Sequence, residues 1–397
     1  MSPKESRSRR LLLVPILFLL GVTGGCKQGP WSLWNSYASR FIDGQGRVVD
    51  PMGGGRTTSE GQSYAMFFAL ADNDPVRFDQ LLKWTQTNMA NGNMAAHLPG
   101  WLWGKSKDGQ WKTLDPNPAS DSDAWIAYSL IEAGRLWNNH TYTLLGRQMM
   151  SLIAKQEVAE LPGFGFMLLP GPAAAFQHNG TWTLNPSYVP LFIFERFAVV
   201  DPAGPWGAIA LNIPRLLRQS ARHGFALDWV DYVPSDGFYP ASAPGAAASD
   251  PKQPTKDIPP PVGSYDAIRV YLWAGMLDET GQTRSELLSA VAGMGSYVAD
   301  HGAPPEKVSD QGIPMEQDGP VGFSAATLPY LRAFPDREKA AAQQRIRMSA
   351  QFDPSSGLYG KDPAYYDQNL VLFATGFLDS RFRFGSRGEL KVEWTRS

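Results

Sequence analysis

The chain has 397 residues, with 38 acidic and 36 basic side chains and a net charge of −2. Nucleic acids and anionic membranes are bound through basic surfaces, so this balance argues against both classes of partner. A single cysteine excludes a disulfide framework and a thiolate metal cage. The five histidines show no pair at metal-ligand spacing, so we predict no metal site.

The N-terminus has the pattern of an export signal. Basic residues between positions 4 and 10 precede an apolar run from Leu11 to Val22, which is followed by small residues and Cys26. This pattern predicts a signal peptide over residues 1–25. The run would span about 18 Å as a helix, short of the ~30 Å hydrocarbon core, so we expect no transmembrane helix. Cys26 stands where bacterial lipoproteins are lipidated, although Thr23 replaces the usual leucine; free secretion and lipid anchoring both stay open.

Helical periodicity dominates the mature chain, and no run of alternating strand residues stands out. Helices are predicted over residues 59–72, 75–90, 121–137, 141–157, 187–199, 206–222, 264–277, 283–301, 322–333, 336–349 and 366–379. Ser59-x-x-Gln62 and Ser120-x-x-Asp123 match capping boxes at two helix starts. Many similar helices indicate paired hairpins that close into one all-α toroid.

Long loops rich in Gly, Pro and Trp connect these helices, notably over 91–119 and 161–186. Loops of this length in a compact domain are usually functional, so we expect them to form an open cleft at one end of the toroid. The stretch 241–263 is interpreted as a surface loop, because the helices on both sides have the same character. Residues 26–397 are therefore expected to form a single domain.

Three acidic clusters lie at predicted helix starts, around Glu60, Asp121 and Asp266. Hydrolysis of a glycosidic bond requires two carboxyl groups, one protonated and one ionised, and clusters at one end of a toroid could converge in this way. Each cluster alone also fits helix capping, because the helix dipole stabilises carboxylates at an N-terminus. That dipole lowers a carboxyl pKa. If Glu60 is the acid, burial and the charge of Asp121 must raise its pKa again.

Residues 119–137, ASDSDAWIAYSLIEAGRLW, resemble the signature of glycoside hydrolase family 8, with Ser122 where the pattern usually has Ala or Gly. Residues 57–65 and 264–269 are similar to the general-acid and general-base segments of that family, and 185–188 and 365–367 to further cleft segments. The resemblance covers roughly residues 30–380. Residues 46–50 and 101–104 look most like the periplasmic endoglucanases that accompany bacterial cellulose synthase.

The resemblance implies an (α/α)6 barrel and an endo-β-1,4-glucanase that inverts the anomeric carbon and needs no cofactor. It implies Glu60 as proton donor, Asp266 as general base and Asp121 as the signature carboxylate, sometimes labelled the nucleophile, which positions the sugar and tunes Glu60. The implied substrate-binding residues are Tyr64, Trp101, Trp103, Asp123, Trp182, Asn185, Tyr188, Tyr265 and Arg269. From periodicity alone, Trp101 and Trp103 fit a core equally well.

Two alternative functions stay open. The same scaffold would serve a chitosanase, xylanase or licheninase, whose substrates differ in substituents or linkage. A non-catalytic glucan-binding lipoprotein of the cell envelope would keep the tryptophans on which sugar rings stack, Trp101, Trp103 and Trp182, without needing both Glu60 and Asp266. The expected partners are a β-1,4-glucan and, as a candidate, the cellulose synthase complex, with no nucleic acid and with membrane contact only through a lipid at Cys26. We expect an exported monomer, in the periplasm, anchored to the outer membrane or secreted.

Overall fold

The computed structural model describes residues 30–244 and 259–395. The predicted signal peptide and Cys26 lie outside these residues. Fourteen α-helices and sixteen short strands are formed within them. None of the helices in this part of the chain is both long and apolar enough to cross a membrane.

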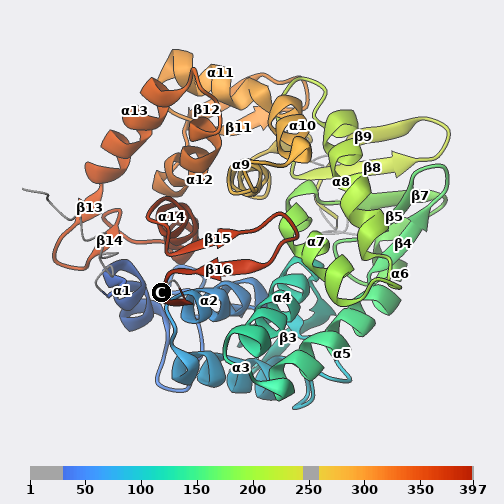
Figure 1. The fold of residues 1–397 in the computed structure, drawn as a ribbon, viewed down its shortest axis with the longest axis vertical. Coiled ribbons are helices and arrows are strands. Elements are labelled where there is room, and N and C mark those ends of the chain that lie inside the picture. The colour runs from blue at the N-terminus through green and yellow to red at the C-terminus, as the bar shows by residue number, and fades with distance from the viewer. Residues whose placement is uncertain (1–29, 245–258, 396–397) are drawn as a thin grey trace, which may run out of the picture.

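Six helices form an inner ring (Figure 1). They are α2 (Ser59–Ala71), α4 (Ser120–Leu136), α7 (Leu191–Val200), α9 (Ile268–Gly275), α12 (Val321–Arg332) and α14 (Tyr365–Leu378). Apart from α7, these helices are buried on nearly every side; in α4, for example, every residue from Ser120 to Gly134 is buried. A helix that is enclosed all round can carry apolar and small residues on all its faces, which is the composition these segments have.

The remaining long helices surround this ring. They are α1 (Ser32–Phe41), α3 (Pro75–Met89), α5 (His140–Gln156), α8 (Trp206–Ser220), α10 (Gln282–Ala290), α11 (Ala292–His301) and α13 (Glu338–Ser349). Each packs against an inner helix: α3 on α2, α5 on α4, α8 on α7, α10 on α9, α11 and α13 on α12, and α1 on α14. The predicted toroid of helical hairpins, an (α/α)6 barrel, is confirmed. A single turn, α6 (Ala173–Phe176), lies in a connecting loop.

Several predicted helix boundaries were wrong. The segment 283–301 forms two helices, α10 and α11, separated at Val291. Residues 264–267 form a turn before α9 rather than its first turn. Neither predicted capping box forms: Thr58, not Ser59, caps α2 by accepting a hydrogen bond from the Gly61 amide, and the Ser120 hydroxyl donates to the Leu169 carbonyl.

The strands were not predicted, because most are short, and three of the pairings, β1 with β2, β7 with β8 and β10 with β11, join segments far apart in the sequence. The antiparallel sheets are β1 (Thr57–Thr58) with β2 (Gly100–Lys105) and β3 (Trp111–Pro118); β4 (Val158–Leu161) with β5 (Gly165–Leu168); β6 (Gln177–His178), β7 (Thr181–Leu184), β8 (Trp229–Val233) and β9 (Gly237–Ala241); β10 (Val262–Gly263), β11 (Pro305–Ser309) and β12 (Pro314–Asp318); β13 (Phe352–Asp353) with β14 (Leu358–Tyr359); and β15 (Phe382–Phe384) with β16 (Leu390–Val392).

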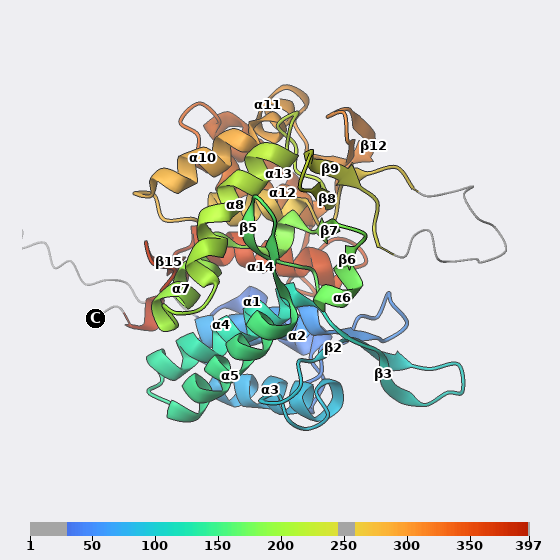
Figure 2. The same cartoon turned by 90° about the vertical axis from the view of Figure 1, so that its right-hand side faces the viewer.

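The β2–β3 hairpin marks one end of the barrel (Figure 2). Strand β1 leads directly into α2 and pairs with β2, so that Thr57 lies opposite Trp103. The N-terminal end of α2 is therefore at the hairpin end, whereas β15 lies at the opposite end. This pairing brings the loop 91–119 next to the start of α2.

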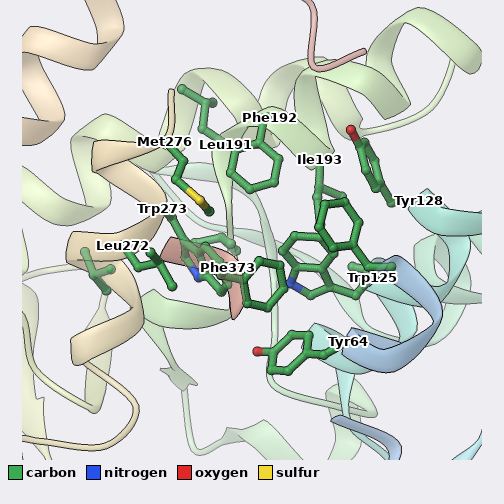
Figure 3. Packing of buried hydrophobic residues seen from close by; sticks show 14 of the residues in the cluster. Tyr64, Trp125, Tyr128, Leu191, Phe192, Ile193, Leu272, Trp273, Met276 and Phe373 are labelled. Carbon is green, nitrogen blue, oxygen red and sulfur yellow. The ribbon is translucent and has the colours of Figure 1, made fainter. Parts of the chain in front are cut away.

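Trp125 of α4 lies at the centre of the aromatic core (Figure 3). Its ring contacts Tyr64 of α2, Phe373 of α14, Trp273 of α9 and Phe192 of α7, with centroids 5.1 to 5.8 Å apart. One buried indole thus packs against four other inner helices, and this contact fixes their relative positions.

Candidate active site

The acidic clusters predicted from the sequence lie at the starts of three inner helices. Glu60 and Asp121 stand in the first turns of α2 and α4, and Asp266 lies in the turn that precedes α9. Arg269 is the second residue of α9. The barrel brings these four side chains together, although they are far apart in the sequence.

The guanidinium of Arg269 contacts all three carboxylates. Its Nη1 atom donates to Glu60 Oε2 at 2.5 Å and to Asp121 Oδ2 at 3.1 Å. Its Nη2 atom donates to Asp266 Oδ1 at 2.6 Å. Glu60 and Asp266 are therefore held by the two terminal nitrogens of one planar group, which is itself only 1% exposed.

Neighbouring side chains fix the orientation of Arg269. Its terminal nitrogens also donate to the Tyr64 hydroxyl at 3.0 Å and to Ser187 Oγ at 3.1 Å. The Ser187 hydroxyl in turn donates to Asn185 Oδ1 at 2.7 Å. The ring of Tyr188 lies 5.4 Å from the guanidinium carbon, within the range of a cation–π contact. Asn185 is buried, and its oxygen accepts from Ser187, so in this structure it positions Ser187 rather than facing the cleft.

Burial raises the pKa of Glu60 to about 7. The Arg269 charge lowers this pKa, and the negative charges of Asp121 and Asp266 raise it. Burial and the Asp121 charge therefore act in the direction that a proton donor at the N-terminus of a helix requires. The Glu60 side chain keeps 19% of its surface exposed, so its carboxyl can still meet a ligand.

A pocket of about 190 Å³ adjoins Asp266 and is lined also by Tyr265, Tyr366 and Asp367. Tyr265 is 44% exposed, and the Tyr366 hydroxyl donates to its backbone carbonyl. The Asp266 side chain is 29% exposed. Space for a ligand therefore exists beside the proposed base, next to an aromatic ring.

The predicted tryptophan platforms differ in their surroundings. Trp103 and Trp111 lie nearly parallel on the β2–β3 hairpin with centroids 5.0 Å apart, and the Arg47 guanidinium lies 4.4 Å from the centroid of Trp103. Both Trp101 and Trp103 are half-buried. Trp182 is only 6% exposed and packs against Tyr232, so it offers no free face to a sugar in this structure.

Asp123 does not reach the cleft. It is fully buried and faces Glu157, which is also fully buried, at the C-terminal end of α5. If both groups are ionised, none of the described residues donates a hydrogen bond to the two carboxylate oxygens of Asp123 or the two of Glu157. A hydrogen bond between them requires that at least one of the two carboxyl groups carries a proton. Burial raises the pKa of Glu157 to about 8 and raises the pKa of Asp123 further still above its ordinary value.

Three residues at the site were not singled out from the sequence: Ser187, Tyr366 and Trp229. The ring of Trp229 makes an edge-to-face contact with Tyr188, with centroids 6.1 Å apart. Ser187 and Tyr366 belong to the two further cleft segments of the family resemblance, but those segments do not show which side chains turn inward. Trp229 carries no motif, and only the pairing of β7 with β8 places it near Tyr188.

Hydrolysis of a glycosidic bond requires two carboxyl groups, one protonated and one ionised. The pKa of about 7 for Glu60 and the nearby Asp266 carboxylate fit this requirement. Within residues 30–244 and 259–395, no group of three or more His, Cys, Asp or Glu side chains is placed to hold a metal ion.

Comparison with known proteins identifies the family. Residues 16–379 match the model of the glycosyl hydrolases family 8. An endoglucanase of Xanthomonas axonopodis pv. citri is 46% identical over 92% of this chain and 90% of its own length. One from Escherichia coli O157:H7 is 39% identical over 97% and 96%. The crystal structure of an endo-1,4-D-glucanase from Vibrio fischeri ES114 superimposes with a TM-score of 0.82 at 36% identity, covering 92% of this chain and 100% of the other. The chain belongs to glycoside hydrolase family 8 and is a glycoside hydrolase.

The Asp123–Glu157 pair predicts a pH-dependent stability. In the folded protein Glu157 keeps its proton up to about pH 8. In the unfolded chain a glutamate loses its proton at about pH 4.3. Between these values the folded state binds more protons, so a rising pH lowers the free energy of unfolding. Glu157→Gln removes one of the two buried titrating groups, and its amide can donate a hydrogen bond to Asp123. The melting temperature of Glu157→Gln minus that of the wild type should therefore increase as the pH rises from 5 to 8.5.

Glu160→Gln is the matched control, because Glu160 is an exposed residue of the adjoining strand β4. Its melting temperature should follow that of the wild type at each pH. A difference in melting temperature between Glu157→Gln and wild type that stays constant over this range would contradict the raised pKa of Glu157.

Proposed function

We propose that this protein is an endo-β-1,4-glucanase that hydrolyses cellulose-like glucans with inversion of the anomeric configuration. The observation that supports this most strongly is that Glu60 and Asp266 accept hydrogen bonds from the two terminal nitrogens of Arg269, at the hairpin end of the barrel. The endoglucanase relatives, which match this chain over nearly its whole length, support the choice of substrate.

In this proposal Glu60 is the proton donor. With a pKa of about 7, its carboxyl keeps a substantial share of its proton near neutral pH. It transfers that proton to the glycosidic oxygen as the bond to the anomeric carbon breaks. Asp121, held by Arg269 and by the Ser122 amide at 2.7 Å, adds negative charge beside Glu60 and faces the positive charge that develops on the sugar.

Asp266 acts as the general base. Its carboxylate takes a proton from a water molecule that attacks the anomeric carbon from the face opposite the leaving group. Arg269 fixes one carboxylate oxygen of Asp266, and the ring of Tyr188 lies 5.4 Å from the guanidinium carbon of Arg269. Because the water attacks the anomeric carbon directly, no covalent sugar intermediate forms and the configuration inverts.

The remaining predicted residues fall into three groups. Tyr188, Tyr265, Trp101 and Trp103 present partly exposed rings and are proposed to bind the glucan by stacking. Tyr64, Asn185 and Arg269 are buried, and we propose that they position the acid and the base. Asp123 and Trp182 are left out of the proposed substrate-binding set because they are buried away from any free surface.

We also infer the biological setting from the sequence. The basic and apolar N-terminal pattern favours export, as a free periplasmic or secreted enzyme or as a lipoprotein anchored through Cys26. Residues 26–397 would be one catalytic domain, acting as a monomer without a cofactor. The resemblance of residues 46–50 and 101–104 to cellulose-synthase-associated enzymes supports a role in cellulose synthesis or export.

Replacement of the proton donor tests the assignment of Glu60. Glu60→Gln should lower kcat on carboxymethylcellulose by about 10²- to 10⁴-fold, because the amide cannot protonate the leaving group. Cellopentaose affinity, measured by calorimetry, should stay close to that of the wild type. Glu338→Gln makes the same change in the first turn of the outer helix α13 and should leave kcat unchanged. Near-wild-type turnover by Glu60→Gln would remove Glu60 from this role.

The products of cellohexaose hydrolysis test the stereochemistry. Proton NMR spectra recorded within the first minutes should show α-anomers at the newly formed reducing ends, before mutarotation mixes them. Initial β-anomers would establish retention and overturn the role of Asp266 as a base toward water. Parallel assays on xylan, chitosan and lichenan separate the alternative substrates, and the absence of turnover on every polymer would favour a binding protein.

A further inference from the structure

The turn that carries Asp266 receives no cap from its own helix. Helix α9 begins at Ile268, and its N-cap residue, Ala267, has no side chain that could accept a hydrogen bond. The amides of a helix start need acceptors, because they have no partner within the helix. In this turn an acceptor comes from a distant part of the chain.

That acceptor is Asp228, in the loop that leads into β8. Its Oδ1 atom accepts from the backbone amides of both Ser264 and Ala267 at 2.8 Å. Its own amide donates to the Val262 carbonyl at 2.9 Å. The two amides lie on either side of Asp266, so a single carboxylate oxygen fixes the backbone before and after the base.

Other contacts hold the same turn at its outer side. The Ser264 hydroxyl donates to the Glu306 carbonyl at 2.8 Å, and the Tyr366 hydroxyl donates to the Tyr265 carbonyl. The backbone of the turn is therefore fixed at several points, and the Ile268 amide also donates to the Ser264 carbonyl at 2.9 Å. Asp228 is the side chain that accepts hydrogen bonds from backbone amides on both sides of Asp266. The negative charge of Asp266 adds to burial in raising the pKa of Asp228 to about 7, which is consistent with the proximity of the two carboxyl groups.

We propose that Asp228 is a positioning residue for the general base: its carboxylate oxygen holds the Ser264 and Ala267 amides and thereby aims Asp266 at the attacking water. The inference rests on the proposed function, since it takes Asp266 to be the base. Asp228 itself contacts neither the substrate nor the water. A displacement of about 1 Å at a catalytic group can cost about 10²-fold in rate, so the loss of this support should appear in kcat.

Three variants of Asp228 separate the position of the acceptor from its charge. Asp228→Ala removes the acceptor and should lower kcat on cellopentaose by about 10- to 100-fold with little change in KM. Asp228→Asn keeps an oxygen at the same place without the charge and should recover most of this loss. Asp228→Glu keeps the charge but moves the oxygen, and it should behave like Asp228→Ala. Asp231→Ala is the matched control: Asp231 lies on β8, and its carboxylate accepts a hydrogen bond from Thr183 Oγ1 rather than from the turn.

A substrate with a better leaving group shows on which side of the reaction Asp228 acts. A dinitrophenyl β-cellotrioside needs no protonation of its leaving group, but it still needs the attacking water. The kcat loss of Glu60→Gln should therefore shrink on this substrate, whereas the loss of Asp228→Ala should persist. If Glu60→Gln shows no recovery, the proposed acid assignment fails; the comparison among the Asp228 variants does not depend on that result.

Several results would overturn the role of Asp228. These are a kcat loss in Asp228→Ala that shrinks on the activated substrate, an increase in KM without a loss in kcat, an Asp228→Asn variant as slow as Asp228→Ala, or an Asp228→Glu variant as fast as wild type. Circular dichroism establishes that each variant is folded. If Asp228→Ala does not fold, the comparison of Asp228→Asn with Asp228→Glu decides the question.

Discussion

One buried guanidinium determines the chemistry of this site. Arg269 carries a single positive charge, yet it contacts Glu60, Asp121 and Asp266, which would carry three negative charges if all were ionised. Water cannot screen these charges effectively at a position that is 1% exposed, so keeping every carboxylate ionised there is costly. Retaining a proton relieves the excess negative charge. Burial and the neighbouring charges favour that proton on Glu60, whose pKa rises to about 7.

The barrel supplies the rigidity that this arrangement needs. The inner helices meet around Trp125, and the starts of α2, α4 and α9 meet at the hairpin end. Tyr64 connects the two regions, because its ring packs against Trp125 while its hydroxyl accepts from Arg269. The aromatic core and the charged site therefore share a residue, and packing in the core limits how far the guanidinium can move.

The sequence was sufficient for the barrel, because helical periodicity is a local signal. It also located the three acidic clusters that the barrel brings together at Arg269, while the catalytic roles of these residues stay predictions. It was not sufficient for side-chain direction. Asp123 stands two residues from Asp121 in the same first turn, yet it points into the protein toward Glu157. Likewise the acceptor for the turn before α9 comes from Asp228, across a long loop, and no local pattern encodes a contact between such distant segments. Short strands such as β1 escaped prediction for the same reason.

Titration of the Glu60 carboxyl carbon tests the central claim most directly. In protein labelled with ¹³C at the glutamate side-chain carboxyl, the Glu60 resonance is the one that disappears in Glu60→Gln. Its chemical shift should change with a midpoint near pH 7, because burial and two neighbouring carboxylates hold the proton against Arg269. A midpoint near the ordinary glutamate value of about 4.3 would contradict the account, because the site would then hold no proton to donate at neutral pH.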